Sequence, residues 1–384
     1  MKQSIVIYLS MMIFLVMSSH YVYKTPRYIS VKYAANHLFR TNMLHPFIFL
    51  SCFVFAAIFG ARYNVGIDQL NYLDIYNNAF NDRYTEEVEL GFAALTRFMS
   101  GLNLHYFFYF GFFAFIQIFC LFYAFRKEQF LYPYLCFILM TSFFLGWMNT
   151  IRQCSAFCIF LCCISLIEKK DFIKYAIVLL LTTFFFHKSA FLLILVYPFF
   201  IKRTNYTPSV ILQVAVYLAV IYLNRTSFIQ DYLDLLGQLT SMTQYGDKYA
   251  DRIVDFNRSW NFGPRVLLGV FVNIVTFLIS PKVKEFYKSK IFDIFYTLYF
   301  YGTCLWILFY GNFIIQRPIE YFYYMGLPVF AYTLYYLRTM ALKKYKNFVL
   351  FLFYLSLQLA VFGGTIYSTT QPNEASAFYF FWQK

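Results

Sequence analysis

Five short polar stretches interrupt the apolar runs of this chain, and they contain residue types that can bind an anion or move a proton. In the first, "RYNVGIDQLNY", Gly66 allows a backbone turn with Arg62 and Asp68 on either side of it. Arginine binds phosphate through paired N–H donors, and a carboxylate can accept a proton from a hydroxyl. Taken alone, the stretch also fits a helix-end turn with a capping aspartate and an arginine at the membrane interface.

The stretch "WMNTIRQCSAF" predicts an anion site at the start of a helix. Asn149, Arg152 and Gln153 have spacings of three and four residues, which place them on one face of that helix. The free N–H groups and the dipole of a helix start add to the guanidinium charge. Polar residues within a span are costly and usually face an interior or a cavity, which favours a functional site over an interface arginine.

The stretch "FFFHKSAF" places His187 and Lys188 between two short apolar runs. These runs barely span a membrane between them, which indicates a hairpin that enters from one face. Two interpretations of His187 stay open, a proton acceptor near neutral pH and a hydrogen-bonded interface residue. Lys188, the next residue, adds a cationic side chain beside His187.

Two further stretches supply an acidic side chain and another arginine. Glu89 in "EEVELGF" adjoins an apolar segment and is expected to turn inward, whereas Glu86 and Glu87 fit a solvated loop. In "FIIQRPIEYFYYMGLP", Arg317 precedes Pro318. Because proline is accepted in the first turn of a helix, we expect Arg317 at the outer mouth of the next span.

The elements that must position these stretches are transmembrane helices. With 61% apolar and 13% charged residues, the chain has too few charges to solvate a soluble surface of 384 residues. Apolar runs near the roughly 20 residues needed to cross a bilayer recur throughout, without the alternation of a barrel. We expect an all-α polytopic membrane protein, a single domain over residues 1–384 with about twelve spans. The predicted spans are 3–19, 43–60, 104–124, 130–148, 151–167, 173–187, 189–201, 208–223, 265–280, 291–310, 318–337 and 347–363.

Lysine and arginine collect in alternate loops, which assigns those loops to the cytoplasm. Both termini and two long loops, about 61–103 and 224–264, then face outward. No small-residue cleavage site follows the first apolar run, which we interpret as a span and not as a cleaved signal. The net charge of +14 is partly this topology signal, so it does not require a nucleic-acid partner.

All five polar stretches map to the outer side, where several cations around one cavity suit a ligand with clustered negative charge. A lipid diphosphate fits, because guanidinium groups pair with phosphate oxygens. The eight cysteines fall within apolar runs and no outer cluster has metal-ligand spacing, so no metal or other cofactor is expected. The candidate diphosphate-binding residues are Arg62, Arg152, Arg317 and Lys188, with Gly66, Asn149 and Gln153 in support.

In their order and separations, these stretches resemble the EpsG family of bacterial membrane proteins, which is related to Wzy-type polymerases of polysaccharide repeat units. The likeness rests on "RYNVGIDQLNY", "EVELGF", "NTIRQCSAF", "FFFHKSAF" and "QRPIEYF". Gly91, Phe92 and Ser189 also match the family's motifs, whereas Gln69 stands where the family often has threonine. The resemblance implies a fold similar to the GT-C glycosyltransferases.

The resemblance further implies a glycosyltransferase that polymerises undecaprenyl-diphosphate-linked oligosaccharides on the outer side of the bacterial inner (plasma) membrane. The product would be an O-antigen, a capsule or an exopolysaccharide, and a chain-length regulator and a flippase of the same pathway would be partners. Arg152, with Arg62 or Arg317, would neutralise the leaving diphosphate. Asp68, His187 or Glu89 would take the proton of the attacking hydroxyl.

Two other functions stay open on the residues alone. A flippase for the same lipid-linked substrate could have about twelve spans and a cationic cavity, but it should open to both sides. The polar groups cluster on one side and no internal halves are detectable, which ranks the flippase second. A membrane acyltransferase built around His187 is the third interpretation.

Overall fold

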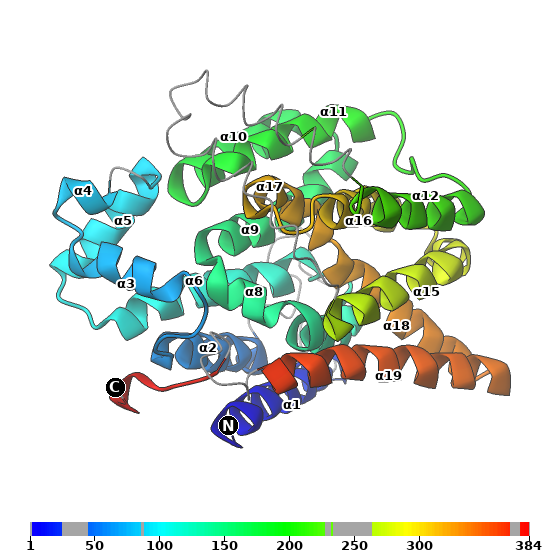
Figure 1. The fold of residues 1–384 in the computed structure, drawn as a ribbon, viewed down its shortest axis with the longest axis horizontal. Coiled ribbons are helices and arrows are strands. Elements are labelled where there is room, and N and C mark those ends of the chain that lie inside the picture. The colour runs from blue at the N-terminus through cyan, green and yellow to red at the C-terminus, as the bar shows by residue number, and fades with distance from the viewer. Residues whose placement is uncertain are drawn as a thin grey trace, which may run out of the picture. The chain divides into compact units, whose positions relative to one another are not determined.

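A computed structural model of the chain describes residues 2–24, 45–85, 88–226, 232, 263–368 and 377–383 (Figure 1). Within these ranges the structure is helical, and extended pairing is limited to one antiparallel bridge between Arg62 and Phe380. The all-α prediction is therefore confirmed. The chain divides into two compact units, Met1–Ile201 with Gln358–Lys384, and Lys202–Leu357.

Unit 1 consists of helices that pack against one another, above all α2 with α6 and α6 with α9. Its elements are α1 (Lys2–Lys24), α2 (Pro46–Ala61), α3 (Gln69–Asn77), α4 (Asp82–Thr85), α5 (Leu90–Gly101), α6 (Tyr106–Ala124), η2 (Gln129–Leu131), α7 (Tyr132–Ile138), the π-helical η3 (Leu139–Phe143), α8 (Phe144–Asn149), α9 (Ile151–Glu168), α10 (Phe172–Phe185), the 3₁₀ helix η4 (Lys188–Leu195), α11 (Val196–Phe200) and η5 (Phe381–Gln383).

Unit 2 holds a second set of apolar helices, and α19 runs from it back into unit 1. Its elements are α12 (Val210–Leu223), α15 (Pro264–Tyr287), α16 (Lys290–Leu308), α17 (Phe313–Tyr323), α18 (Gly326–Ala341) and the first part of α19 (Tyr345–Ser368). The predicted outer loop 224–264 lies mostly outside the described residues.

Seven helical segments of the described chain are long and apolar enough to cross a membrane, and four shorter apolar helices accompany them. This confirms a polytopic membrane protein, because a span needs about 20 apolar residues. The seven segments are Gln3–Lys24, Tyr106–Ala124, Gln129–Asn149, Ile151–Glu168, Pro264–Tyr287, Lys290–Leu308 and Tyr345–Tyr367, and the shorter helices are Pro46–Ala61, Phe172–Phe185, Lys188–Phe200 and Val210–Leu223.

The predicted span 318–337 is wrong. The helix α17 begins at Phe313, so that Pro318 lies inside it and not in its first turn. This helix ends at Tyr323, and α18 starts after a turn at Tyr324 and Met325. Asn312 fixes the early start, because its side-chain oxygen accepts the N–H of Ile315 at 3.1 Å and so caps α17.

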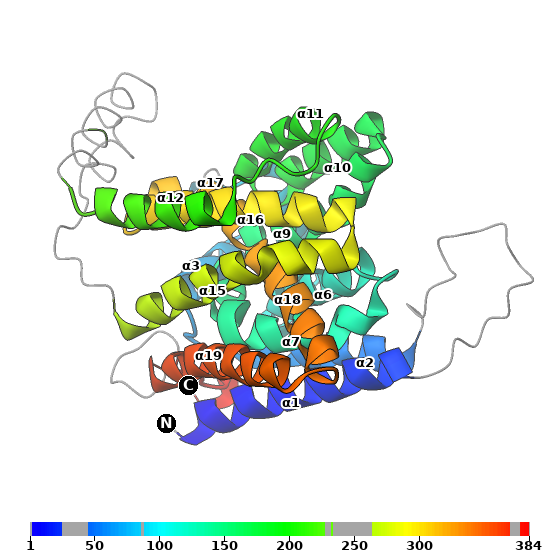
Figure 2. The same ribbon diagram turned by 90° about the vertical axis from the view of Figure 1, so that its right-hand side faces the viewer.

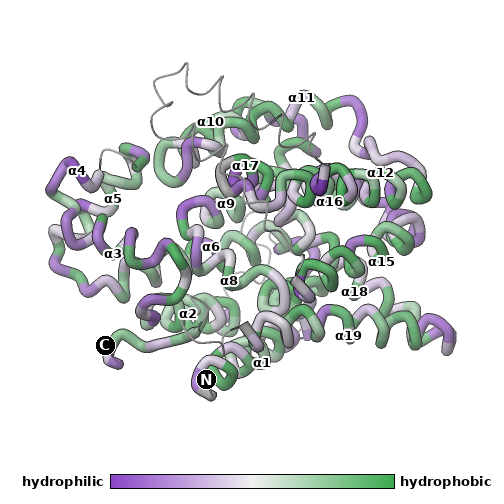
Figure 3. Tube along the Cα trace, viewed as in Figure 1, coloured by the Kyte–Doolittle hydropathy of each residue, from purple (hydrophilic) through white to green (hydrophobic). Residues whose placement is uncertain are grey.

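The segment 61–103, which we expected as a long outer loop, folds into the three helices α3, α4 and α5. Figure 3 shows α3 and α4 as mostly hydrophilic, in contrast to the apolar α2 and α6. A buried aromatic cluster holds α3 and α5 to α6, and it includes Tyr72 and Phe92 together with Tyr109 and Phe113. The excess of aromatic residues in the sequence thus builds part of the scaffold on which the polar stretches lie.

Two glycines allow α2 and α6 to pack closely, side by side in Figure 2. A Cβ on Gly60 would lie 2.3 Å from the carbonyl oxygen of Phe107, and one on Gly111 would lie 3.3 Å from that of Ala56. Small residues of this kind let helix backbones approach each other within a membrane. The contact fixes the end of α2, and therefore the start of the first polar stretch, against the beginning of α6.

Candidate active site

Four of the five polar stretches meet at one end of unit 1, where helices begin or end. Arg62 follows α2, Glu89 immediately precedes α5, Arg152 lies in the first turn of α9, and His187 caps the start of η4. Gly91 lets α5 approach α10 closely, because a Cβ there would lie 2.7 Å from the rings of Phe184 and Phe185. This close approach brings the stretch that contains Glu89 against the stretch that contains His187.

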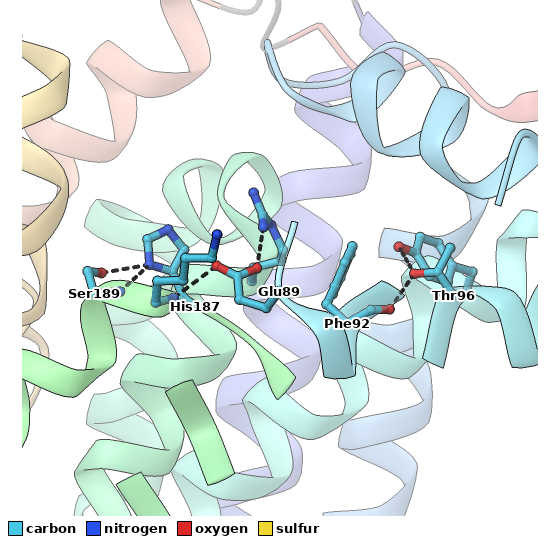
Figure 4. Close-up of polar contacts among 8 residues, drawn as sticks. Glu89, Phe92, Thr96, His187 and Ser189 are labelled. Carbon is cyan, nitrogen blue, oxygen red and sulfur yellow. Dashed lines mark hydrogen bonds and ion pairs between the residues drawn. The ribbon is translucent and has the colours of Figure 1, made fainter. Parts of the chain in front are cut away.

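Glu89 is the centre of the cluster and uses both of its carboxylate oxygens. Its Oε2 forms an ion pair with Arg152, and its Oε1 accepts the backbone N–H of Lys188 at 2.9 Å. In Figure 4, Glu89 lies between Phe92 and the turn that holds His187 and Ser189. The side chain is 5% exposed, so the prediction that Glu89 turns inward is confirmed. The Lys188 side chain itself is exposed.

Arg152 is enclosed by rings on the sides that Glu89 does not occupy. Its guanidinium lies 5.2 Å from the centroid of the Phe92 ring and 5.7 Å from that of Tyr72. Its Nε is buried and has no hydrogen-bond partner among the described residues. Gln153, the next residue, is buried on the same helix. Arg152 is therefore a partly buried cation, with its side chain 18% exposed, that keeps one N–H donor which no described residue accepts.

Asn149, in "WMNTIRQCSAF", forms hydrogen bonds with the stretch "RYNVGIDQLNY". Its Oδ1 accepts the backbone N–H of Asp68 at 3.0 Å, and its Nδ2 donates to the Asp68 carboxylate at 3.3 Å. Gly66 has φ of +91°, and a Cβ there would lie 2.9 Å from the Asn149 oxygen. The turn therefore requires a glycine both for its backbone angle and for space.

The prediction that Asn149 shares a helix face with Arg152 and Gln153 is wrong. Asn149 is the last residue of α8, and α9 starts at Ile151. Thr150 separates the two helices, because its φ of −96° and ψ of 63° are not helical. The break turns the amide of Asn149 towards Asp68 and leaves Arg152 with Glu89.

Arg62 is the most unusual side chain of the cluster. It is fully buried, and within the described residues none of its three guanidinium nitrogens has a hydrogen-bond partner. The guanidinium lies 5.2 Å from the ring centroids of both Phe59 and Phe110. Burial lowers the pKa of Arg62 to about 9, which leaves it protonated at neutral pH. A buried charge that lacks a hydrogen bond is costly, which makes Arg62 a candidate for binding an anion.

Two residues that we had not assigned to the site hold Arg62 in place. Gln69 is 1% exposed; its Nε2 donates to the Arg62 carbonyl at 2.8 Å, and its Oε1 accepts the Val65 N–H at 2.7 Å. Tyr72 interacts electrostatically with both Arg62 and Arg152. The three-residue spacing of Gln69 and Tyr72 places both on one face of α3, a signal that the sequence does contain.

His187 acts as a cap in this structure. Its Nδ1 accepts the Ser189 N–H at 3.3 Å and lies 2.6 Å from the Ser189 hydroxyl. Accepting at Nδ1 places the proton of the neutral ring on Nε2. The predicted break between two short runs is confirmed, because α10 ends at Phe185 and η4 begins at Lys188. To act as a base through Nδ1, His187 would have to release its hydrogen bond from the Ser189 N–H.

Arg317 belongs to unit 2, where its side chain is exposed on α17. In the described part of the chain, no three His, Cys, Asp or Glu side chains lie together as a metal site would require.

The fold and the site define a class: an all-α polytopic membrane protein with buried arginines where its helix ends meet. A family model matches residues 45–375, and the chain belongs to the EpsG family. This is a family of Wzy-type polymerases, which suggests a role in polysaccharide polymerisation. None of the curated proteins and none of the solved structures matches the chain, so the likeness to the GT-C fold stays a prediction.

Proposed function

We propose that this protein joins lipid-linked oligosaccharide repeat units into a polysaccharide. The growing glycan, carried on undecaprenyl diphosphate, is transferred to the incoming lipid-linked unit on the outer side of the bacterial inner membrane. Family membership supports the polymerase class. The observation that carries the proposal is Arg62, a fully buried guanidinium whose nitrogens have no hydrogen-bond partner in the part of the chain that the structure describes.

The electrostatics of the cluster favour a multiply charged anion. Glu89 balances Arg152, whereas no oxygen among the described residues accepts a hydrogen bond from the Arg62 guanidinium. A diphosphate carries several negative oxygens, and guanidinium groups bind such oxygens through paired N–H donors. Because these cations are already desolvated, they stabilise charge that develops on a leaving diphosphate without solvent reorganisation.

The proposed step replaces one glycosidic bond with another. A hydroxyl oxygen of the incoming unit bonds to the anomeric carbon of the growing chain, and the bond from that carbon to the diphosphate breaks. The diphosphate leaves with the electron pair, and the hydroxyl proton passes to a base. Every atom is then accounted for in a longer lipid-linked glycan, a lipid diphosphate and a proton.

Asp68 is the best placed of the three candidate bases. Both oxygens of Glu89 already accept bonds, one from a guanidinium and one from a backbone N–H. The Nδ1 of His187 accepts the cap from Ser189. Asp68 is half-buried, and Asn149, a neutral amide, holds its carboxylate. We assign Asp68 as the base, with Glu89 orienting Arg152 and His187 shaping the turn.

The length of α9 supports the assignment to the outer side. Arg152 lies at one end of this 18-residue helix and Lys169 follows its other end, a rise of about 27 Å. Lys169 and Lys170 form one of the basic loops that the positive-inside rule assigns to the cytoplasm. The cluster at Arg152 then faces the opposite side of the membrane.

Arg152→Ala tests the proposal in cells and in proteoliposomes. We expect long polymer to disappear while single repeat units persist. The matched control is Arg126→Ala, because Arg126 lies beyond the other end of α6, 3.9 Å from the ring centroid of Tyr123. A normal polymer ladder from well-expressed Arg152→Ala protein would remove this residue from the site.

The same proteoliposomes separate the rival functions. Lipid-linked oligosaccharide that crosses the bilayer without becoming longer would identify a flippase and would rule out the polymerase. Label taken up from an acyl donor, with no change in glycan length, would identify an acyltransferase instead.

A further inference from the structure

Two segments outside the family-matched residues 45–375 meet beside Arg62. One is the start of α1, residues 3–8, and the other is the C-terminal segment 377–383; together we call them the terminal clasp. The carbonyl of Tyr379 accepts the N–H of Tyr63 at 2.8 Å, and Phe380 forms an antiparallel bridge with Arg62. The backbone that carries the buried guanidinium is therefore paired with the C-terminal segment.

The two halves of the clasp also hold each other. The N–H of Phe378 donates to the hydroxyl of Ser4 at 2.9 Å, and both residues are 2% exposed. The ring of Phe378 contacts that of Tyr8 edge-on, with centroids 5.9 Å apart. Figure 1 shows the N and C ends near each other, and the amides of Gln3 and Gln383 exchange two hydrogen bonds of 2.7 and 2.9 Å.

The clasp reaches Arg62 through side chains as well. Tyr8 is fully buried and interacts electrostatically with the guanidinium. Phe381 packs on the start of α6, with its ring centroid 4.7 Å from that of His105. Arg62 is thereby enclosed by α2, α6, α1 and the C-terminal segment. Water that reached it from the clasp would weaken its interaction with an anion, since water screens charge.

We propose that the terminal clasp positions Arg62 and keeps water from it, so that the guanidinium meets its anionic ligand already desolvated. The consequence for catalysis rests on the proposed function, whereas the enclosure of Arg62 does not. Phe378 is the buried anchor of the clasp, and the Ser4 hydroxyl accepts the backbone N–H of Phe378. Both work through Arg62 and contact no substrate themselves.

Three variants of the full-length protein in lipid nanodiscs test this role. Phe378→Ala removes the anchor, and Ser4→Ala removes only the hydroxyl that accepts from Phe378. The matched control is Trp382→Ala, because Trp382 is 62% exposed and its ring stacks on Phe380, within the clasp. The first measurement is the rate at which phenylglyoxal modifies Arg62, read by peptide mass spectrometry. The second is the affinity for farnesyl diphosphate as probe.

We expect Arg62 to be protected in the wild type and modified at least about tenfold faster in Phe378→Ala, because the local opening becomes easier. Ser4→Ala should give a smaller increase, and Trp382→Ala should match the wild type. Farnesyl diphosphate binding should weaken in the same order. If Phe378→Ala does not fold, Ser4→Ala decides the question.

Protection of Arg62 in folded Phe378→Ala and Ser4→Ala would overturn the proposal. So would a loss of diphosphate binding in Trp382→Ala without modification of Arg62, because the segment would then contact the ligand directly. Reactive Arg62 in the anchor variant, together with a wild type that binds no diphosphate, would support the clasp and count against the proposed function.

Discussion

Both units bury polar groups among apolar helices, but they do so in different ways. In unit 2, Asn273 donates to the Tyr217 hydroxyl at 2.9 Å and accepts from the Tyr299 hydroxyl at 2.7 Å, while Tyr296 donates to Gln213 at 2.6 Å. Every residue in these hydrogen bonds is neutral, although the Lys284 ammonium lies 4.3 Å from the ring centroid of Tyr296. The cluster in unit 1 contains an ion pair and, in Arg62, a buried cation without a hydrogen bond to any described residue.

The contrast separates stabilisation from function. Neutral groups that satisfy one another hold helices together within a membrane at little cost. An unpaired buried charge stabilises nothing by itself, and such groups in membrane proteins mark binding sites and pathways. We therefore propose that the neutral network serves folding and that the charged cluster binds substrate.

Breaking the ion pair should have the largest effect on stability. Glu89→Gln leaves Arg152 buried without its counter-charge, and a pair broken in this way costs about 3 kcal/mol. We expect this loss in unfolding measurements in bicelles, together with loss of polymer. The double variant Glu89→Gln with Arg152→Gln should regain stability but not activity. Equal stability of wild type and Glu89→Gln would mean that the pair is not buried in the membrane.

Breaking the neutral network should lower stability without lowering activity. Asn273→Leu removes the amide that joins the hydroxyls of Tyr217 and Tyr299, which should cost about 2 kcal/mol. Polymer made per folded molecule should match the wild type, as measured after normalising to the folded fraction. A loss of activity in folded Asn273→Leu protein would show that the neutral network also takes part in function.

Releasing the loop that carries Arg62 should have the smallest effect on stability. Gln69→Ala removes two hydrogen bonds to the backbone, at Arg62 and Val65, and should cost about 1 kcal/mol. Activity should fall more than stability, because Arg62 loses its fixed backbone. Gln69→Glu, which keeps the acceptor to Val65, is the comparison. Unchanged activity in both variants would remove Gln69 from the positioning of Arg62.

The helical class and most helix positions follow from composition and apolar run length. The sequence predicted the break before η4, because His187 and Lys188 interrupt the apolar run. It did not predict helices in 61–103, where the packing of Tyr72 and Phe92 on α6 decides the fold. Contacts of this kind join residues far apart in the chain, so local periodicity does not contain them.

For the candidate site too, the sequence predicted individual residues but not the contacts between residues far apart in the chain. Motifs identified Arg62, Asp68, Glu89, Asn149 and Arg152, since their residue types are costly in a membrane. Their partners were not predictable, because the pairing of Glu89 with Arg152 and of Asn149 with Asp68 depends on how the ends of four helices meet. The bridge between Arg62 and Phe380 joins opposite ends of the chain and leaves no pattern in the sequence.

Arg62→Leu, measured for both binding and stability, tests whether Arg62 is an anion site or a structural residue. We expect farnesyl diphosphate binding to disappear while the free energy of unfolding stays the same or rises, because an apolar side chain removes the cost of a buried charge. Arg62→Lys should retain part of the binding. Unchanged diphosphate binding in Arg62→Leu, or a large loss of stability, would contradict the assignment of Arg62 to the site.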